Sequence, residues 1–442
     1  MRRNSIIRRI GRCTTAIIIL ALVILVLQVY NLFLLYKMES REFASDARGE
    51  SQSMFKWPWI LWETSDDFKN PKIQLKLGTP VGLFNALPDD KSGQYKIRHF
   101  YVRPEHNSAI SSDRDVTLIT QCSANNLHHL ILMANRWQGP MSIAVFVPGH
   151  FAHLSHRFVY ELRECSPTLK ANASFHMVYP KAHLPSDSEF MYVPLNHHLP
   201  CEVIQKKAKT IPGMNYALMQ MPYPNNLLRN VARKHVASQF IFLVDIDTIP
   251  SQGLRAQYNS FAAAFHLFEP AYAREAVVYV VPVFEMQHGK PPPATKSKLL
   301  EAVRSGLARQ FYVSRCFKCH SPTDYAKWLS FDSAQNSVLR PLYMVEWHDA
   351  YEPFYIGRNT VPLYDERFKQ YGFNRISQVC ETNMAGYQFA VLDHAFLVHE
   401  GFKMKDEFHA SKDAENARNR ELYKKFKHDM RLKYPNSKRS CD

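Results

Sequence analysis

The chain of 442 residues is 46% hydrophobic and 13% aromatic, which suits a large core and excludes a chain that is disordered as a whole. A length of this order corresponds to about two or three domain-sized units. The formal charge of +15 is concentrated at the two ends, where orientation signals and solvated helix faces explain it more simply than nucleic-acid binding.

The first long apolar run predicts a transmembrane segment at 14–36. No residue from Cys13 to Tyr36 is charged, and this length is sufficient to span a bilayer. A cleaved signal peptide has a shorter apolar region followed by small residues, whereas this run continues through 32–35. Because five arginines precede it, the positive-inside rule predicts a cytosolic tail at 1–13 and sends the remainder to the lumen or outside.

The residues after the expected span include seven cysteines: Cys122, Cys165, Cys201, Cys316, Cys319, Cys380 and Cys441. A lumenal compartment favours disulfides, and the odd count leaves at least one cysteine unpaired or intermolecular. We interpret Cys316 and Cys319 as a disulfide or local bridge, because no further ligands with zinc-finger spacing accompany them. The acceptor sequence that begins at Asn172 predicts N-glycosylation.

Residues 37–97 are polar with scattered aromatic residues and prolines, and we expect a stem there that becomes ordered near its end. The catalytic-looking unit follows at 98–442. Strands are expected at 115–121, 141–147, 175–179, 240–244, 276–284 and 389–392, and helices at 125–136, 223–234, 253–268, 296–304 and 413–434. Strands that alternate with helices indicate an α/β fold with a parallel or mixed sheet.

The central motif is Asp245-Ile-Asp247, which follows a five-residue apolar run typical of a strand buried on both faces. Carboxylates at i and i+2 project the same way, so both can reach one divalent cation, and that cation can hold a diphosphate. The plainer alternative is a pair of turn or helix-capping residues.

A second alternative for the same motif is an aspartyl-phosphate phosphatase of the haloacid dehalogenase type. In that class Asp245 is the nucleophile and Asp247 the acid/base. Such an enzyme also needs a downstream paired-Asp metal motif, and neither Asp-Asp nor Gly-Asp-x-x-x-Asp follows Asp247. The phosphatase is therefore the minor hypothesis.

The helix expected before the acidic strand carries four polar residues that share much of one face: Asn226, Arg229, Asn230 and Arg233. A solvated face is the ordinary interpretation of this pattern, and lining of a ligand groove is the alternative. We expect the N-terminus of this helix to lie at the opposite end of the unit from Asp245.

Two further places in the sequence contain candidate catalytic or metal-binding residues. Asp349 and Glu352 lie just before an aromatic run, and aromatic rings stack on sugars while carboxylates take hydroxyl protons, although an ordinary loop rim has the same composition. His399 ends an apolar strand before a glycine. It is a candidate metal ligand, and a structural role is the alternative.

Several spaced stretches together resemble glycosyltransferase family 49. They are Asp115-Val-Thr-Leu-Ile-Thr-Gln121, Arg136-Trp-Gln-Gly-Pro140, Tyr223-Pro-Asn-Asn-Leu-Leu-Arg-Asn-Val-Ala232, Leu243-Val-Asp-Ile-Asp247, Glu352-Pro-Phe-Tyr355, Tyr364-Asp-Glu-Arg-Phe368, Tyr371-Gly-Phe-Asn-Arg375 and Phe396-Leu-Val-His-Glu-Gly-Phe-Lys403. The most similar type is the single-domain, signal-anchored glucuronyltransferase, which is related to the second glycosyltransferase domain of the LARGE enzymes. The resemblance covers roughly residues 99 to 441.

The resemblance implies a GT-A, Rossmann-like fold with a mixed central sheet, in a single-pass type II Golgi membrane protein with a lumenal catalytic domain. The implied reaction is inverting, Mn²⁺-dependent transfer of glucuronate from UDP-glucuronate to a xylose-terminated O-mannosyl glycan, as on α-dystroglycan. Another metal-dependent UDP-sugar transferase of this fold is the alternative. Association with other glycosyltransferases stays open, and we expect no nucleic-acid partner.

The resemblance also implies roles for single residues. Asp245, Asp247 and His399 are the expected metal ligands, and Asn226, Arg229, Asn230 and Asp245 are the donor-side candidates. For the base that takes the acceptor proton, Asp349 or Glu352 is the first choice and Asp365 or Glu366 the second. Where several other GT-A families carry the base in Gly-x-Glu-Asp, this chain has 371–375 with no acidic residue.

Overall fold

The computed structural model describes residues 84, 86–105, 113–185, 199–209, 221–331, 338–404 and 411–442. The chain divides into two units, Met1–Leu77 and Gly78–Asp442, and all described residues lie in the second. The expected cytosolic tail, transmembrane segment and most of the stem lie outside the described residues. Among the helices that are described, none is long and apolar enough to cross a membrane.

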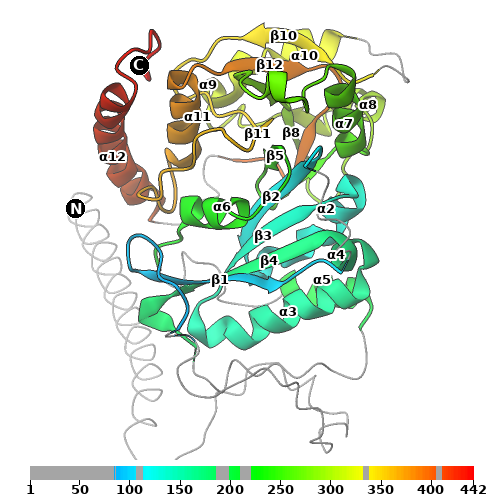
Figure 1. The fold of residues 1–442 in the computed structure, drawn as a ribbon. Helices are drawn as coiled ribbons and strands as arrows, with labels where there is room; N and C mark the ends of the chain where they lie inside the picture. The colour runs from blue at the N-terminus through cyan, green and yellow to red at the C-terminus, as the bar shows by residue number, and fades with distance from the viewer. Residues whose placement is uncertain are drawn as a thin grey trace, which may run out of the picture. The chain divides into compact units, whose positions relative to one another are not determined.

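A nine-stranded mixed sheet runs through the second unit (Figure 1). Its strands in spatial order are β1 (Tyr95–Val102), β4 (Ala173–Pro180), β3 (Met141–Phe146), β2 (Val116–Ser123), β5 (Phe240–Leu243), β11 (Tyr355–Arg358), β7 (Val277–Val280), β12 (Gln388–Leu392) and β10 (Pro341–Val345). Strands β4, β3, β2 and β5 are parallel, whereas β1, β11 and β10 pair antiparallel with their neighbours. The mixed α/β fold is therefore confirmed.

The first strand begins before the expected start of the catalytic unit. Strand β1 pairs with β4 from Tyr95 onward, so the boundary expected at residue 98 falls inside a strand of the sheet. Phe84 is also buried and belongs to the hydrophobic core. The end of the expected stem is thus part of the folded unit.

A second sheet has four strands, in the order β6 (Thr248–Pro250), β13 (Leu397–Glu400), β8 (Val283–Met286) and β9 (Ala308–Gln310). The single strand expected at 276–284 is therefore wrong, because it is the two strands β7 and β8 in different sheets. Pro282 lies at the break, and since proline has no N–H to donate to a strand ladder, it marks where the chain leaves one sheet for the other.

The chain passes from the large sheet to the small sheet three times. The passages lie between β5 and β6, between β7 and β8, and between β12 and β13. The Asp245-Ile-Asp247 motif occupies the first of these passages. This position places one aspartate near the large sheet and the other beside the small one.

Helices cover both faces of the large sheet (Figure 1). The helices are α2 (Leu130–Trp137), α3 (Ala152–Cys165), α4 (Pro167–Asn172), α5 (Cys201–Lys209), α6 (Asn225–Arg233), α7 (Leu254–Ala264), α8 (Lys296–Arg304), α9 (Phe317–His320), α10 (Tyr325–Ser330), α11 (Asn374–Met384) and α12 (Lys412–Lys433), with 3₁₀ turns at Ala124–His129, Gly149–Phe151, Lys181–His183, Pro270–Tyr272 and Ser321–Thr323. The helices expected at 223–234, 296–304 and 413–434 are confirmed, apart from small differences at their ends. The one expected at 125–136 is a 3₁₀ turn at Ala124–His129 followed by α2, and the one expected at 253–268 is α7, which ends at Ala264.

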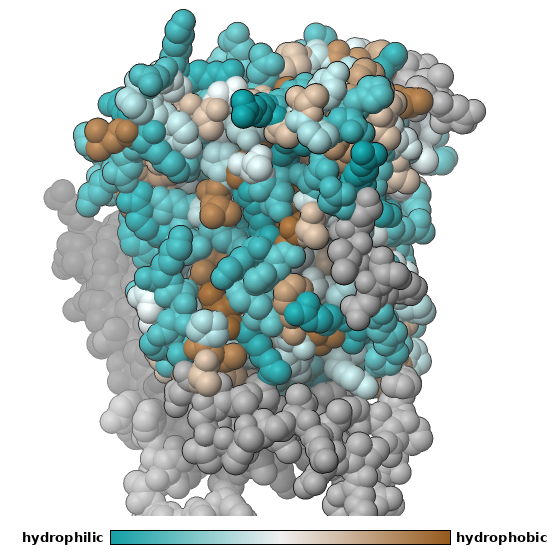
Figure 2. Space-filling view, viewed as in Figure 1, coloured by the Kyte–Doolittle hydropathy of each residue, from teal (hydrophilic) through white to brown (hydrophobic). Residues whose placement is uncertain are grey.

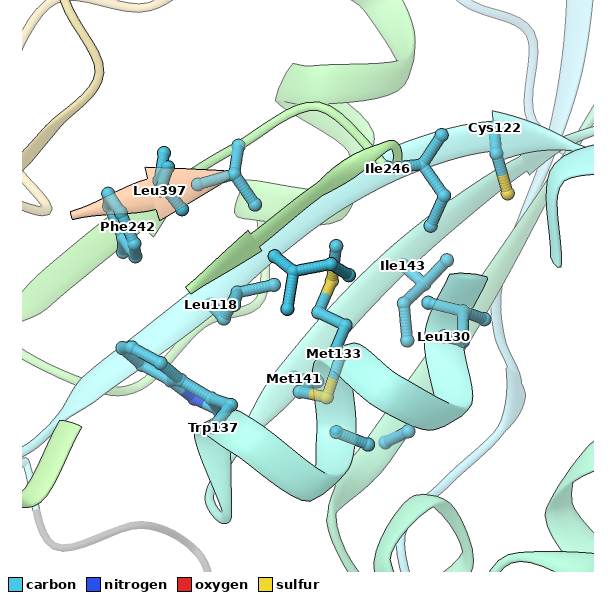
Figure 3. Packing of buried hydrophobic residues seen from close by; sticks show 14 of the residues in the cluster. Leu118, Cys122, Leu130, Met133, Trp137, Met141, Ile143, Phe242, Ile246 and Leu397 are labelled. Carbon is cyan, nitrogen blue, oxygen red and sulfur yellow. The ribbon is translucent and has the colours of Figure 1, made fainter. Parts of the chain in front are cut away.

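The core has one cluster on each face of the large sheet. Adjacent residues of β2 enter different clusters, Leu118 one and Ile119 the other, because successive side chains of a strand point to opposite faces. Figure 3 shows the first cluster, where Met133 and Trp137 of α2 pack against Leu118 and its neighbours. The face seen in Figure 2 is largely hydrophilic, and its hydrophobic side chains form small separate patches.

Three disulfides hold parts of this unit together: Cys165–Cys201, Cys316–Cys319 and Cys380–Cys441. The expected local bridge at the Cys-x-x-Cys motif is confirmed. Among the described cysteines, Cys122 is free and buried, as the odd count required. The Cys380–Cys441 bridge ties the C-terminal end, which follows α12, to α11.

Candidate active site

Asp245 lies directly after β5 and is held by two arginines. Its Oδ1 accepts a hydrogen bond from Arg229 Nη2 of α6 (3.2 Å), and its Oδ2 accepts one from Arg375 Nη2 of α11 (2.6 Å). Burial alone would raise the pKa of this carboxyl, but the charges of Arg375 and Arg229 outweigh it and the pKa lies below its usual value. Asp245 is therefore ionised, and the two arginines balance its negative charge.

The polar face of α6 is buried, so the expected solvated face is wrong. Each of Asn226, Arg229, Asn230 and Arg233 is less than 9% exposed. Arg229 of α6 bonds both Asn226, near the start of the helix, and Asp245, so the first half of the helix lies near the end of β5. The expectation that its N-terminus lies far from Asp245 is also wrong.

The donor-side candidates on α6 have different neighbours. Arg229 contacts Asp245, and it also donates to Asn226 Oδ1 (2.8 Å). Asn226 donates to Asp365 O (2.8 Å), while Asn230 donates to Glu366 Oε1 (2.8 Å). The two asparagines therefore bind the segment that leads to Arg375, and Arg229 is the member of this set that reaches the acidic motif.

Asp247 lies at the start of β6 and faces β13. Its Oδ2 is 3.0 Å from His399 Nε2 and 3.5 Å from Lys403 Nζ. Burial alone would raise the pKa of Asp247, but the neighbouring His399 and Lys403 hold it well below its usual value. The β6–β13 pairing places Thr248 opposite His399, so the expected partner of Asp247 is brought to it by strand register.

The hydrogen-bond partners of His399 indicate whether Asp247 and His399 together suit a cation. Its Nδ1 is 2.9 Å from Gly401 O, and since a carbonyl can only accept, Nδ1 carries a proton. When the ring is neutral, the lone pair of Nε2 therefore points toward the carboxylate of Asp247. Two lone-pair atoms 3.0 Å apart need a shared proton or a cation, and metal-ligating histidines commonly make such a bond with their other nitrogen.

Asp247 and His399 therefore fit a divalent cation, and they are two of the three expected ligands. Asp245, the third, uses both carboxylate oxygens on arginines. Within the part of the chain that the structure describes, no group of three or more His, Cys, Asp or Glu side chains could hold a metal ion.

The four candidate bases lie in different environments. Asp349 has a side chain that is 53% exposed and paired with Lys318 (3.4 Å). Asp365 is paired with Arg367 (2.6 Å), and Glu366 accepts from Asn230, as described above. Glu352 differs from them because burial raises its pKa to about 7, an effect that Arg375 partly offsets.

A carboxyl with a pKa near 7 is suited to take a proton at neutral pH. Within the described residues, the Glu352 carboxylate makes no hydrogen bond, whereas its backbone N–H donates to Cys319 O (2.9 Å). The structure thus favours Glu352 over the other three candidates.

Sequence reasoning missed Arg375 as a site residue. Its guanidinium lies 3.9 Å from the centroid of the Phe354 ring while it binds Asp245. The stretch 371–375 that resembles family 49 has no acidic residue and instead supplies this cation. The signal was present in the stretch itself, because a buried acid pair needs compensating positive charge.

The expected glycosylation site lies at the junction of α4 and β4. Asn172 is half-buried, and its side-chain amide donates to Thr168 O (3.0 Å). Ser174, the third residue of the sequon, donates to Met141 O (3.2 Å). Glycosylation at Asn172 stays a prediction.

A family model described as glycosyl-transferase for dystroglycan matches residues 115–435, a range that includes the acidic passage between the two sheets. The chain belongs to this family, which confirms the resemblance to family 49.

Several named proteins are similar to this chain over most of its length. β-1,4-Glucuronyltransferase 1 of Danio rerio is 38% identical over 387 residues, which cover 84% of this chain and 87% of the relative. The Homo sapiens protein of the same name is 38% identical over 376 residues, covering 84% and 86%. Xylosyl- and glucuronyltransferase LARGE1 of Homo sapiens is 28% identical over 308 residues, which cover 69% of this chain and 33% of the relative.

Proposed function

We propose that the chain is a glucuronyltransferase that moves glucuronate from UDP-glucuronate to a xylose-terminated O-mannosyl glycan, in β-1,4 linkage and with inversion. The names of the relatives support the donor sugar and the linkage, and the family description supports a dystroglycan-type acceptor. We further propose a GT-A arrangement of the two sheets. The apolar run at 14–36 and the arginines before it support a type II membrane protein whose catalytic unit is lumenal, and we place it in the Golgi because of the resemblance to family 49.

The observation that carries the proposal is that the two aspartates of the acidic motif have different partners. Asp245 is neutralised by two arginines, while Asp247 Oδ2 lies 3.0 Å from His399 Nε2. Asp247 and His399 would hold Mn²⁺, with Asp245 beside them. When bound, the ion neutralises charge that develops on the oxygens of the leaving diphosphate.

Glu352 then takes the proton that the acceptor hydroxyl loses in the transfer. The bond between C1 of glucuronate and the diphosphate oxygen breaks, and UDP keeps the electron pair. A bond forms from the 4-hydroxyl oxygen of xylose to C1 on the opposite face, and the hydroxyl proton goes to Glu352. A carboxylate with a pKa of about 7 is deprotonated often enough at neutral pH to accept it.

Arg229 and Arg375 contribute by keeping Asp245 ionised in a partly buried site. An acid pair without such partners would share a proton, because like charges at short range disfavour double ionisation. The arginines therefore leave both aspartates available as anions. They also bring positive charge to the place where an anionic donor would bind.

The test is a panel of UDP-sugars with xylose-terminated acceptors, using the full chain with and without Mn²⁺. We expect turnover with UDP-glucuronate and Mn²⁺, strong loss in Asp247→Asn, and a lowered kcat in Glu352→Gln. Turnover with a different UDP-sugar would overturn the donor assignment. Hydrolysis of an aryl phosphate that is lost in Asp245→Asn would favour the phosphatase, and binding of UDP and xyloside without turnover would favour a lectin-like protein.

A further inference from the structure

The Cys316–Cys319 disulfide closes a tight turn beside the proposed base. The turn lies at α9, where Cys319 N donates to Cys316 O (3.0 Å) and the two sulfurs are bonded. The carbonyl of Cys319 accepts the backbone N–H of Glu352 (2.9 Å). The position of Glu352 is therefore linked through one hydrogen bond to the covalent closure of this turn.

The next residue of the turn supports the other side of the site. His320 is 2% exposed, and its ring is nearly parallel to that of Phe354, with centroids 6.4 Å apart. Arg375 lies over the same Phe354 ring (3.9 Å) and binds Asp245. The turn thus contacts both the segment that carries Glu352 and the ring on which Arg375 rests.

The size of the closed loop argues against a role in global stability. The sequence separations of the three disulfides are 36, 3 and 61. In the chain-entropy account, stabilisation grows with the number of residues that the bridge encloses. The Cys316–Cys319 bridge constrains the unfolded chain least, and yet its turn is bonded to the segment that carries Glu352.

We propose that the Cys316–Cys319 disulfide is a positioning element for Glu352 and for the Phe354 ring beneath Arg375. Its loss lets the turn relax and misplaces the base while the fold persists. The inference rests on the proposed function, because Glu352 is assigned there as the base. Small displacements of a reacting group are costly, since about 1 Å can reduce a rate about 100-fold.

The experiment compares two double variants of the full chain. Cys316→Ala/Cys319→Ala removes the turn closure, and Cys165→Ala/Cys201→Ala removes a longer bridge between α3 and α5 as the matched control. For the first we expect kcat to fall about 10- to 100-fold with a nearly unchanged melting temperature and KM for UDP-glucuronate. For the control we expect the reverse, a lower melting temperature with kcat retained.

A double-variant cycle separates positioning of Glu352 from a general effect on the fold. If the disulfide acts through Glu352, removing it in the Glu352→Gln background lowers kcat little further, because residues that act as a unit are not additive. An unchanged kcat in Cys316→Ala/Cys319→Ala, or full additivity with Glu352→Gln, overturns the inference. Full activity of Glu352→Gln alone overturns the assignment of the base in the proposed function instead.

Discussion

Replacing Glu352 with glutamine should stabilise the protein at high pH and remove its activity. Burial raises the pKa of Glu352 from its ordinary value of 4.5 to about 7, with Arg375 in partial opposition. Between these values the folded protein holds a proton that the unfolded chain releases. The stability contributed by Glu352 is therefore fully present below pH 4.5 and is lost as the pH rises through about 7.

The size of the effect follows from the two pKa values. Their difference corresponds to about 3 kcal/mol. Glu352 retains some contact with solvent, so we expect about 2 kcal/mol after allowing for screening. Glutamine has no proton to lose. The free energy of unfolding of the variant should therefore rise by this amount relative to that of the parent when the pH increases from 4.5 to 8.5.

The assay is urea unfolding of parent and variant at these two pH values, without donor or metal. Asp349→Asn is the matched control, because it makes the same carboxylate-to-amide change at a side chain that is 53% exposed. In parallel, kcat of the parent should rise through about pH 7 and fall about 10²- to 10⁴-fold in Glu352→Gln. A stability difference that does not change with pH would refute the reasoning.

Three other perturbations test neighbouring parts of the site. Asp247→Asn should weaken Mn²⁺ binding, measured as free ion by electron paramagnetic resonance, with a melting temperature near that of the parent; undiminished binding contradicts the pairing with His399. Arg375→Met should lower the free energy of unfolding by about 1–3 kcal/mol, because a mostly buried partner of Asp245 is lost. Arg367→Met, at a half-exposed pair, should cost less than about 1 kcal/mol, and an equal loss in both variants would contradict this account. Burial raises the pKa of the Cys122 thiol, so peptide mass spectrometry should find it unmodified by a thiol reagent until the protein is unfolded.

The strands of the large sheet were predictable because short apolar runs in the sequence indicate that they are buried. The runs at 115–121 and 141–147 are rich in apolar and β-branched residues, and both form buried strands in the structure. The run at 276–284 has the same composition but belongs to two sheets. Composition alone does not show where a chain changes partners, and Pro282 was the one local mark of that change.

The acidic motif was predictable in its position, whereas its cationic partners were not. Two carboxylates at i and i+2 after a strand form a local pattern, and His399 was identified from its place at a strand end. Arg375 is 130 residues from Asp245 in sequence, and no periodicity connects them. The polar face of α6 was misread for the same reason: the pattern of a solvated face is identical to that of a face buried against a remote polar segment.

The three passages between the sheets have a mechanical consequence for the acid pair. Asp245 is fastened to helices that pack on the large sheet, whereas Asp247 is fastened to a strand of the small sheet. A small rotation of one sheet against the other would alter the spacing of the two carboxylates without detaching either from its cationic neighbour. The distance between the two carboxylates therefore depends on how the two sheets are placed relative to each other.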